Sequence, residues 1–310
     1  MDRPERLLVV DKPVGPTSHD VVDRLRRALG EKRIGHTGTL DPAASGVLVL
    51  LVGRATRLAR FMAADEKEYQ ARIQLGVETD SYDARGTIVG PPFTGVWPTE
   101  ATVREAVESL VGTLPQVPPI YSAKKIGGRP SYELARKRSV LVSDENERRP
   151  APVEVTLSAA VVTACGDGII DLQLTCSAGF YVRSLAHDLG ERLATGAHLA
   201  ALRRTRSGSA TLLDAHPLAE LETNRNAVTA IVPMARMLPH LPSLVLTQAG
   251  VRKVGHGQLL GAEDFEASGT EPPAGDVLRL LTPAGALVAV ARSTEHESGL
   301  RVLHPSVVLM

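Results

Sequence analysis

Long hydrophobic runs are missing from this chain of 310 residues. A membrane-spanning helix needs roughly 20 consecutive apolar residues, and no segment of the sequence approaches that length, so a helical membrane span is excluded. The residues before Asp11 also lack a hydrophobic stretch long enough for a secretory signal. We therefore expect the protein to work in the cytoplasm.

Cysteine is scarce, with Cys165 and Cys176 as its two examples. They flank a predicted hairpin turn at residues 166–168, but they are out of register across it. Seven positions of offset at about 3.3 Å each separate the two thiols by on the order of 20 Å. A disulfide cannot span that distance, so we expect two reduced thiols.

Neither sign of charge is in excess, because 35 basic residues balance 35 acidic ones. This balance argues against a generic nucleic-acid binder. The charges are nevertheless uneven, since residues 123–138 carry six basic side chains against Glu133 alone. We interpret this segment as a loop that binds a phosphate backbone through Lys124, Lys125 and Arg129, with an affinity that depends on salt.

The most unusual segment present is residues 35–48, which reads GHTGTLDPAASGVL. Its three glycines and Pro42 indicate a shaped loop, and a strand-like apolar run over residues 47–52 follows. One carboxylate, Asp41, stands in the middle, shortly after His36. Catalytic groups concentrate in loops that a rigid sheet supports, whereas an aspartate in a turn often hydrogen-bonds its own backbone. The segment alone is compatible with both roles.

This segment fills every fixed position of the signature G-H-x-G-x-L-D-P-x-A-[ST]-G-x-L. It thereby resembles the TruB-type pseudouridine synthases, which modify tRNA. Further blocks resemble the same family in the family's order, and together they extend over about residues 7–210. These blocks are residues 8–18, 67–69, 76–86, 118–125, 179–185 and 196–205.

The resemblance implies the isomerisation of a uridine to pseudouridine, usually uridine 55 in the T-loop of tRNA. It implies that Asp41 is the catalytic carboxylate, which acts as a nucleophile at C1′ or as a base at the 2′ position. Arg183 matches the arginine that pairs with this carboxylate. Tyr69 matches the tyrosine that stacks on the uracil and assists removal of the C5 proton. The positions that match the surroundings of the flipped nucleotide are His36, Tyr181 and Leu202.

Such an isomerisation exchanges no electrons with a partner and releases no group, so we expect no cofactor and no metal. The expected partner is the T arm of tRNA. We expect the protein to be a monomer and to have no membrane partner. Two alternatives stay open. The chain could be an RNA-binding factor that does not use its pocket, or Asp41, Asp80 and Asp83 could gather a metal for a hydrolase. Asp80 and Asp83 otherwise suit hydrogen bonding within their loop, and the pair His187–Asp188 is interpreted as structural.

The hydrophobic pattern predicts an α+β fold with a long mixed or antiparallel central sheet, flanked by helices and loops. Helices are predicted to begin at Thr17 or Ser18, at Thr99 and at Ser184. The predicted strands of this sheet are residues 7–10, 47–52, 69–75, 153–165 and 169–176.

Two domains are predicted along the chain. Residues 1–240 form a catalytic domain with an RNA-binding insertion near residues 120–150. Residues 241–310 form a small β-rich unit whose position resembles the C-terminal PUA-type RNA-binding domain of the family. Residues 262–301 carry seven acidic side chains against three arginines, and a negative face argues against phosphate contacts there.

Overall fold

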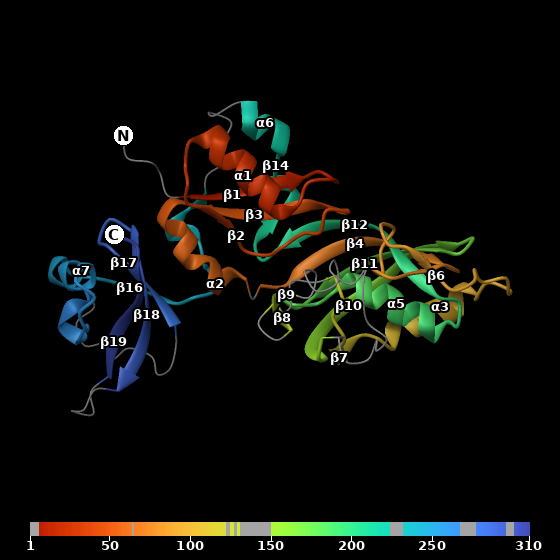
Figure 1. Cartoon of the computed structure of the whole chain (residues 1–310). Helices are drawn as coiled ribbons and strands as arrows, with labels where there is room; N and C mark the ends of the chain where they lie inside the picture. The colour runs from red at the N-terminus through yellow and green to blue at the C-terminus, as the bar shows by residue number, and fades with distance from the viewer. Residues whose placement is uncertain are drawn as a thin grey trace.

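The computed structural model describes residues 6–63, 65–121, 125–126, 129–130, 150–223, 232–266, 277–295 and 301–310. In these ranges the chain forms a mixed sheet of eleven strands, a separate sheet of four strands near the C-terminus, and helices around them (Figure 1). This confirms the predicted α+β class. None of the described helices is both long and apolar enough to cross a membrane.

The large sheet has the order β14-β1-β3-β12-β4-β11-β10-β7. Strand β12 lies near its middle, where it runs parallel to β3 and antiparallel to β4. Its strands are β1 (Arg6–Lys12), β3 (Ala44–Val52), β4 (Lys67–Leu75), β7 (Gly112–Gln116), β10 (Val153–Gly166), β11 (Ile169–Cys176), β12 (Ala197–Ser207) and β14 (His216–Pro217). Three short strands pair at its side, namely β2 (Ile34–His36), β13 (Ala210–Thr211) and β15 (Val232–Pro233).

Both faces of the β1–β3 end of the sheet are buried. On β1, Leu8 and Val10 join the core beneath the helices, whereas Leu7 and Val9 point to the opposite face and pack in a second core. Strands covered on both faces read as continuous apolar runs, which is why the sequence reveals β1 and β3 so clearly.

The helices of the large sheet share the first core. Helices α1 (Ser18–Leu29) and α6 (Leu218–Thr223) pack together near β1, while α3 (Glu100–Glu108) packs on β10 and α5 (Val182–Arg192) on β12. Figure 1 shows these two pairs over opposite ends of the sheet. A short 3-10 helix η1 (Gly53–Leu58) and α2 (Ala59–Met62) follow β3.

Helix boundaries follow local capping chemistry. Thr17 caps α1 by accepting a hydrogen bond from the backbone N–H of Asp20, and the Asp20 carboxylate accepts one from the backbone of Thr17 in return. Gly30 ends this helix at a φ of +63°. Helix α5 begins at Val182, two residues earlier than predicted. Its N-cap Tyr181 forms no capping side-chain hydrogen bond, so the sequence carries no start signal at this residue.

The four C-terminal strands form a second sheet, as the predicted β-rich unit requires. They are β16 (Ser243–Val245), β17 (Val277–Leu281), β18 (Leu287–Glu295) and β19 (Arg301–Val308), accompanied by α7 (Gln248–Gly255). Leu287, Val290 and Leu309 of this part pack in the same core as Leu7 and Val9 of β1. The small sheet therefore packs against the face of the large sheet opposite to the face that α1 covers. The domain boundary at residue 240 stays a prediction.

The remaining elements are short. Pairs of two-residue strands form β5 (Glu78–Thr79) with β6 (Ile88–Val89) and β8 (Lys125–Ile126) with β9 (Arg129–Pro130); the 3-10 turns are η4 (Leu212–Asp214), η5 (Met234–Arg236) and η6 (Ala262–Asp264). Cys165 pairs opposite Ile170 and Cys176 opposite Leu157, and both cysteines are free, as predicted.

Candidate active site

The loop that carries Asp41 connects β2 to β3, and the segment around the start of α1 holds it from one side. The buried hydroxyl of Ser18 bonds both backbone groups of Leu40, donating to its oxygen at 2.9 Å and accepting from its nitrogen at 2.8 Å. The N–H of Gly15 donates to the oxygen of Pro42 at 2.8 Å. Asp41 thus lies between two residues whose backbones are fixed.

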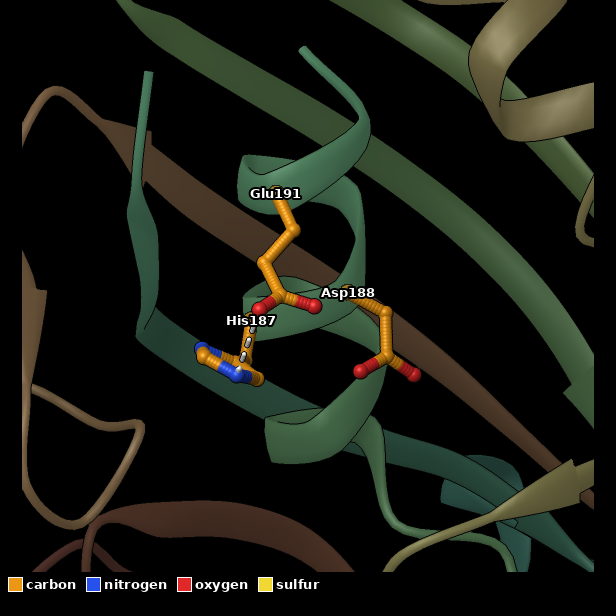
Figure 2. Close-up of side chains that lie close together, drawn as sticks. All are labelled: His187, Asp188 and Glu191. Atoms are coloured by element: carbon orange, nitrogen blue, oxygen red, sulfur yellow. Dashed lines mark ion pairs between the residues drawn. The ribbon is translucent and has the colours of Figure 1, made fainter. Parts of the chain in front are cut away.

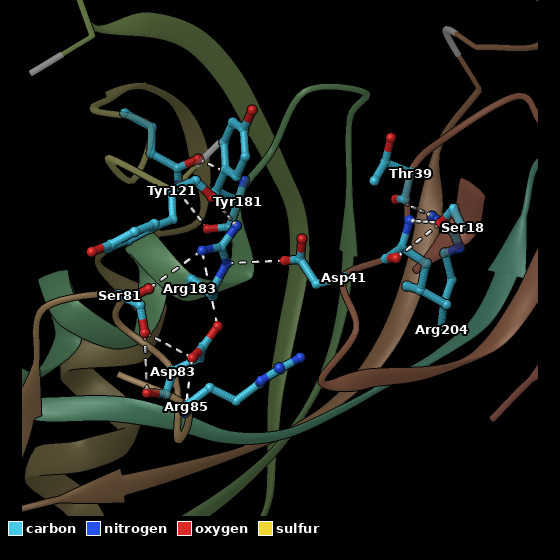
Figure 3. A network of polar contacts seen from close by, with 12 residues as sticks. Ser18, Thr39, Asp41, Ser81, Asp83, Arg85, Tyr121, Tyr181, Arg183 and Arg204 are labelled. Carbon is cyan, nitrogen blue, oxygen red and sulfur yellow. Dashed lines mark hydrogen bonds and ion pairs between the residues drawn. The ribbon is translucent and has the colours of Figure 1, made fainter. Parts of the chain in front are cut away.

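Arg204 of β12 holds the same loop from below (Figure 3). Its side chain is fully buried. The guanidinium donates to the oxygens of Gly38 at 3.1 Å, Thr39 at 3.2 Å and Val47 at 2.7 Å. The glycine-rich loop therefore has a defined shape, because a buried cation binds two of its carbonyl groups and a third in the strand that follows it.

Asp41 faces a buried arginine. Its Oδ2 lies 3.0 Å from Nε of Arg183, and the two side chains are 38% and 6% exposed. Within the described residues, the Nε–H of Arg183 meets no acceptor at hydrogen-bonding geometry. The contact is therefore an ion pair, and the carboxylate keeps its lone pairs for other partners. The expected pairing of these two residues is present in the structure.

Arg183 is itself held by the loop after β5. Its guanidinium donates to the oxygens of Tyr121 at 3.0 Å and Ser81 at 3.4 Å, and Nη1 lies 3.9 Å from Oδ2 of Asp83. Asp83 accepts hydrogen bonds from the Ser81 hydroxyl and the Arg85 N–H. Figure 3 shows this network converging on Arg183 from three segments of the chain. These bonds fix the direction in which Arg183 presents Nε to Asp41.

A small cavity opens beside Asp41. Asp41, Asp83 and Arg183 form its polar side, and residues 199–202 of β12 form its apolar side together with Ala43 and Ala44. Leu202 is thus placed in the cavity wall. A half-exposed carboxylate at the edge of a cavity that contains a buried cation can act on a bound ligand.

Tyr69 lies behind this cavity rather than in its lining. It stands on β4, is 8% exposed and packs in the core of the large sheet. Burial raises the pKa of Tyr69, whereas the charge of Arg204 and its hydrogen bond to the phenol lower it. The charge of Asp41 also acts on this pKa, so the two predicted residues lie close enough to interact.

His36 and Tyr181 flank the site without lining the cavity. Burial lowers the pKa of His36, and the positive charge of Arg204 adds to the effect. The buried Nδ1 of His36 has no partner among the described residues. Tyr181 is fixed through its backbone, which exchanges two hydrogen bonds with the side-chain amide of Gln116.

The predicted phosphate contacts cannot be placed as side chains. Lys124 lies outside the described residues, and Lys125 and Arg129 are described as backbone positions in the β8–β9 pair. The start of this insertion is anchored next to Arg183, because the Ser184 hydroxyl donates to the oxygen of Val117 at 2.8 Å. The phosphate-binding role stays a prediction.

Sequence reasoning missed three residues that shape the site: Ser18, Lys12 and Arg204. Ser18 reads as a helix cap, but Thr17 does the capping and leaves the Ser18 hydroxyl for the loop. Lys12 is fully buried and donates to the oxygens of Pro13 and Pro16. Burial lowers the pKa of Lys12 to about 8, although the charge of Asp41 opposes the shift.

A second polar cluster lies on α5, at His187, Asp188 and Glu191 (Figure 2). Their donor atoms lie within 4.8 Å of one another. Nδ1 of His187 is 3.1 Å from Oε1 of Glu78, and its ring stacks on Tyr82 at 4.0 Å. These contacts tie α5 to the loop that carries Asp83, which agrees with a structural role.

The alternative metal site is not supported by the geometry. Asp41 is paired with Arg183, and the Asp83 carboxylate is bonded within its own loop. Asp80 accepts a hydrogen bond from the N–H of Thr87 at 2.9 Å. Among the described residues, Asp41, Asp80 and Asp83 do not bring their oxygens close enough together to hold one ion.

Comparison with known families and proteins gives a consistent result. Residues 26–182 match the N-terminal domain of the TruB family pseudouridylate synthases, and residues 183–238 match the tRNA pseudouridylate synthase B C-terminal domain. A protein of Geobacter sulfurreducens named tRNA pseudouridine synthase B is 42% identical over 292 residues, which cover 92% of each chain. One of Solibacter usitatus with the same name is 38% identical over 98% of this chain and 99% of that protein.

Solved structures with a similar fold include a chain of a Cbf5–Nop10–Gar1 complex. It is 26% identical with a TM-score of 0.73, over 98% of this chain and 85% of that one. A chain of the archaeal box H/ACA sRNP Nop10–Cbf5 complex shares the fold at 24% identity and a TM-score of 0.72, over 100% of this chain and 89% of that one. On these matches, the chain belongs to the TruB family of pseudouridylate synthases.

Proposed function

We propose that the protein converts a uridine of tRNA, uridine 55 in the T-loop, to pseudouridine, with Asp41 as the catalytic carboxylate. The observation that carries this proposal is the ion pair of Asp41 with buried Arg183 at the edge of a cavity. The substrate class is supported by the relatives that bear the name tRNA pseudouridine synthase B.

The reaction is balanced within the substrate. The bond from C1′ of the ribose to N1 of uracil breaks, the ring turns, and a bond forms from C1′ to C5. The proton on C5 leaves and N1 gains one, so no electrons are exchanged. In one route the Asp41 carboxylate attacks C1′ and forms a sugar ester, whose bond breaks when C5 bonds to C1′. In the other it takes the 2′ proton to give a glycal and returns that proton when C5 bonds to C1′.

Both routes need an ionised carboxylate with a free lone pair. Arg183 places a positive charge 3.0 Å from this carboxylate. Since the ion pair lacks hydrogen-bonding geometry, the Asp41 oxygens stay available to the ribose. Arg183 has further acceptors in Tyr121 and Ser81, so it keeps its place while Asp41 reacts.

Tyr69 would stack on the detached uracil and assist loss of the C5 proton. Burial raises the pKa of Tyr69, so its ring is neutral at neutral pH and suits stacking on a base. The charge of Arg204 opposes this rise in pKa without reversing it.

The surrounding residues would hold the flipped nucleotide and the RNA. His36, whose pKa burial lowers and whose Nδ1 has no partner in the part of the chain that the structure describes, would fill the place of the extruded base. Tyr181 and Leu202 would flank the uracil. The RNA backbone would lie along the insertion near Lys124 and Lys125. Residues 241–310 would act as a PUA-like unit of a cytoplasmic, monomeric enzyme.

The direct test is a pseudouridine-specific readout on a T-arm RNA, such as carbodiimide labelling followed by primer extension. We expect a stop at the position of uridine 55 and none in RNA that carries cytidine there. The same assay, run with and without EDTA, separates the alternatives. A metal-dependent hydrolase would cleave the RNA without EDTA and would lose that activity in its presence. Tight RNA binding without conversion would instead indicate a binding factor.

A further inference from the structure

Arg204 lies in register with both strands that carry the proposed reacting groups. On one side of β12 it pairs with Gly46, the third residue of β3 after the Asp41 loop. On the other side it pairs with Tyr69 of β4. The backbone of Arg204 therefore lies between the strand that follows the Asp41 loop and the strand that carries Tyr69.

The side chain of Arg204 also interacts with residues of both regions. Its guanidinium donates to the oxygens of Gly38, Thr39 and Val47, which lie on both sides of Asp41 in the sequence. Its positive charge also acts on the Tyr69 phenol, whose pKa it lowers against the larger effect of burial. The loop carbonyl groups and the tyrosine thus both interact with one rigid, planar cation.

The approach of β3 to β12 at this point is unusually close. Gly46 has a φ of +103°, and a Cβ built on it would lie 2.2 Å from the backbone oxygen of Arg204. A side chain at residue 46 would push the two strands apart. Glycine at residue 46 therefore permits the close approach of the two strands. This approach brings the Arg204 guanidinium to the carbonyl groups of residues 38, 39 and 47.

The burial of Arg204 is not explained by an ion pair. It is 1% exposed, and among the described residues no carboxylate lies within ion-pair distance of it. A buried charge that only neutral groups satisfy is costly. An apolar side chain of similar size would avoid this cost, but it would leave the carbonyl groups of Gly38, Thr39 and Val47 without this donor, so the arginine serves the position of the loop.

We propose that Arg204 is a positioning residue that sets the placement of Asp41 relative to Tyr69, because its guanidinium binds the carbonyls around Asp41 while its backbone pairs with Tyr69 in the sheet. This rests on the proposed function, in which both residues act on the same nucleotide. Misplacement of a reacting group by about 1 Å can lower a rate on the order of 10²-fold. Arg204 would thus control the rate without touching the RNA.

The test compares Arg204→Lys and Arg204→Met with Arg206→Lys as the matched control. Arg206 stands on the same strand, but it pairs with Glu68 at 2.8 Å, away from the loop. Three quantities are measured below the melting temperature of each variant: the single-turnover rate at saturating T-arm RNA, the affinity for that RNA, and amide hydrogen exchange in residues 37–47.

We expect both Arg204 variants to exchange faster in residues 37–47 and to lose about 10²-fold in single-turnover rate, with RNA affinity nearly unchanged. Arg204→Lys introduced into Tyr69→Phe should cost far less than in the parental protein, because the two residues act together. Arg206→Lys should leave the exchange unchanged, and its effect should multiply with that of Tyr69→Phe.

The proposal is overturned if loop exchange stays at the parental level, or if the effects of Arg204→Lys and Tyr69→Phe simply multiply. A parental protein that makes no pseudouridine contradicts the proposed function instead. In that case, amide hydrogen exchange in residues 37–47 still shows whether Arg204 stabilises the loop, because this measurement does not depend on activity.

Discussion

At the scale of single residues, the site combines one half-exposed carboxylate with several buried cations. Arg183, Arg204 and Lys12 are all nearly inaccessible, yet each faces the loop of Asp41 or its neighbours. Their donors are directed mainly at backbone oxygens. These three cations therefore hold the backbone around the loop in position. Of the contacts named here, only the ion pair of Arg183 involves the Asp41 carboxylate.

The sequence motif points to Asp41 and Arg183 because both stand in long, specific blocks, and the structure brings them together across 142 positions of the chain. Arg204 also stands in a matching block, residues 196–205, but nothing in the sequence shows that its side chain is buried under the Asp41 loop. An arginine on a strand reads as solvent-exposed until its neighbours are known, and β3 and β4 reach Arg204 from distant parts of the chain. Ser18 is missed for a different reason, since two adjacent hydroxyls compete for one capping role.

One prediction at this scale concerns the Tyr69 hydroxyl. Tyr69→Phe keeps the ring and removes the hydroxyl that would take the C5 proton, so the reaction should stall after the glycosidic bond breaks while RNA affinity stays near normal. Tyr69→Leu removes the ring as well and should also weaken binding. Single-turnover assays and filter binding measure the two effects. Equal loss of RNA affinity in both variants would show that the hydroxyl is architectural.

At the scale of elements, the strands buried on both faces are predicted well, and β12 is not. Its residues alternate irregularly between buried and partly exposed because one side lines the cavity and register shifts interrupt its pairing with β4. Its parallel partner β3 is also far away in sequence. Periodicity cannot reveal a strand whose pattern is set by a site and by distant partners.

The close approach of β3 to β12 gives a second prediction. Gly46→Ala should lower the free energy of unfolding by at least about 2 kcal/mol, because the added Cβ meets backbone and φ is positive. Gly35→Ala is the control, since its Cβ would meet nothing nearer than a methyl group at 3.9 Å. Urea unfolding measures both. Equal stability of the two variants would contradict the close contact.

At the scale of the whole molecule, two sheets pack around a shared apolar core. Arg54 and Arg57, which follow β3, donate to the backbone oxygens of Leu309 and Val308 at the end of the C-terminal sheet. The small sheet is thus bonded to the segment that leads from the Asp41 loop toward Tyr69. Its existence is predictable from the change in composition after residue 240, whereas its docking face depends on contacts between distant segments.

Net charge is zero for the whole chain, so RNA binding must depend on local clusters. Replacing Lys124, Lys125 and Arg129 with alanine should weaken T-arm binding and reduce the slope of log affinity against log salt by about 2 to 3, as three lost phosphate contacts require. Turnover at saturating RNA should change little. An unchanged slope would show that the cluster is a solvated face. The control replaces three arginines that already pair with carboxylates, namely Arg24, Arg72 and Arg104.

The central claim is that Asp41 performs the chemistry, and Asp41→Asn tests it most directly. Asparagine has nearly the same shape but is neither a nucleophile nor a base at neutral pH. Because Asp41 is 38% exposed and Arg183 keeps its other acceptors, the loss of stability should stay below the ~3–5 kcal/mol of breaking a buried pair. A thermal melt establishes that the variant is folded.

The decisive measurement is the yield of pseudouridine from T-arm RNA with folded Asp41→Asn in excess over the RNA, alongside its affinity for the same RNA. We expect no product, while binding stays close to parental because phosphate and pocket contacts do not depend on this charge. A folded Asp41→Asn protein that makes pseudouridine at near the parental rate would contradict the account.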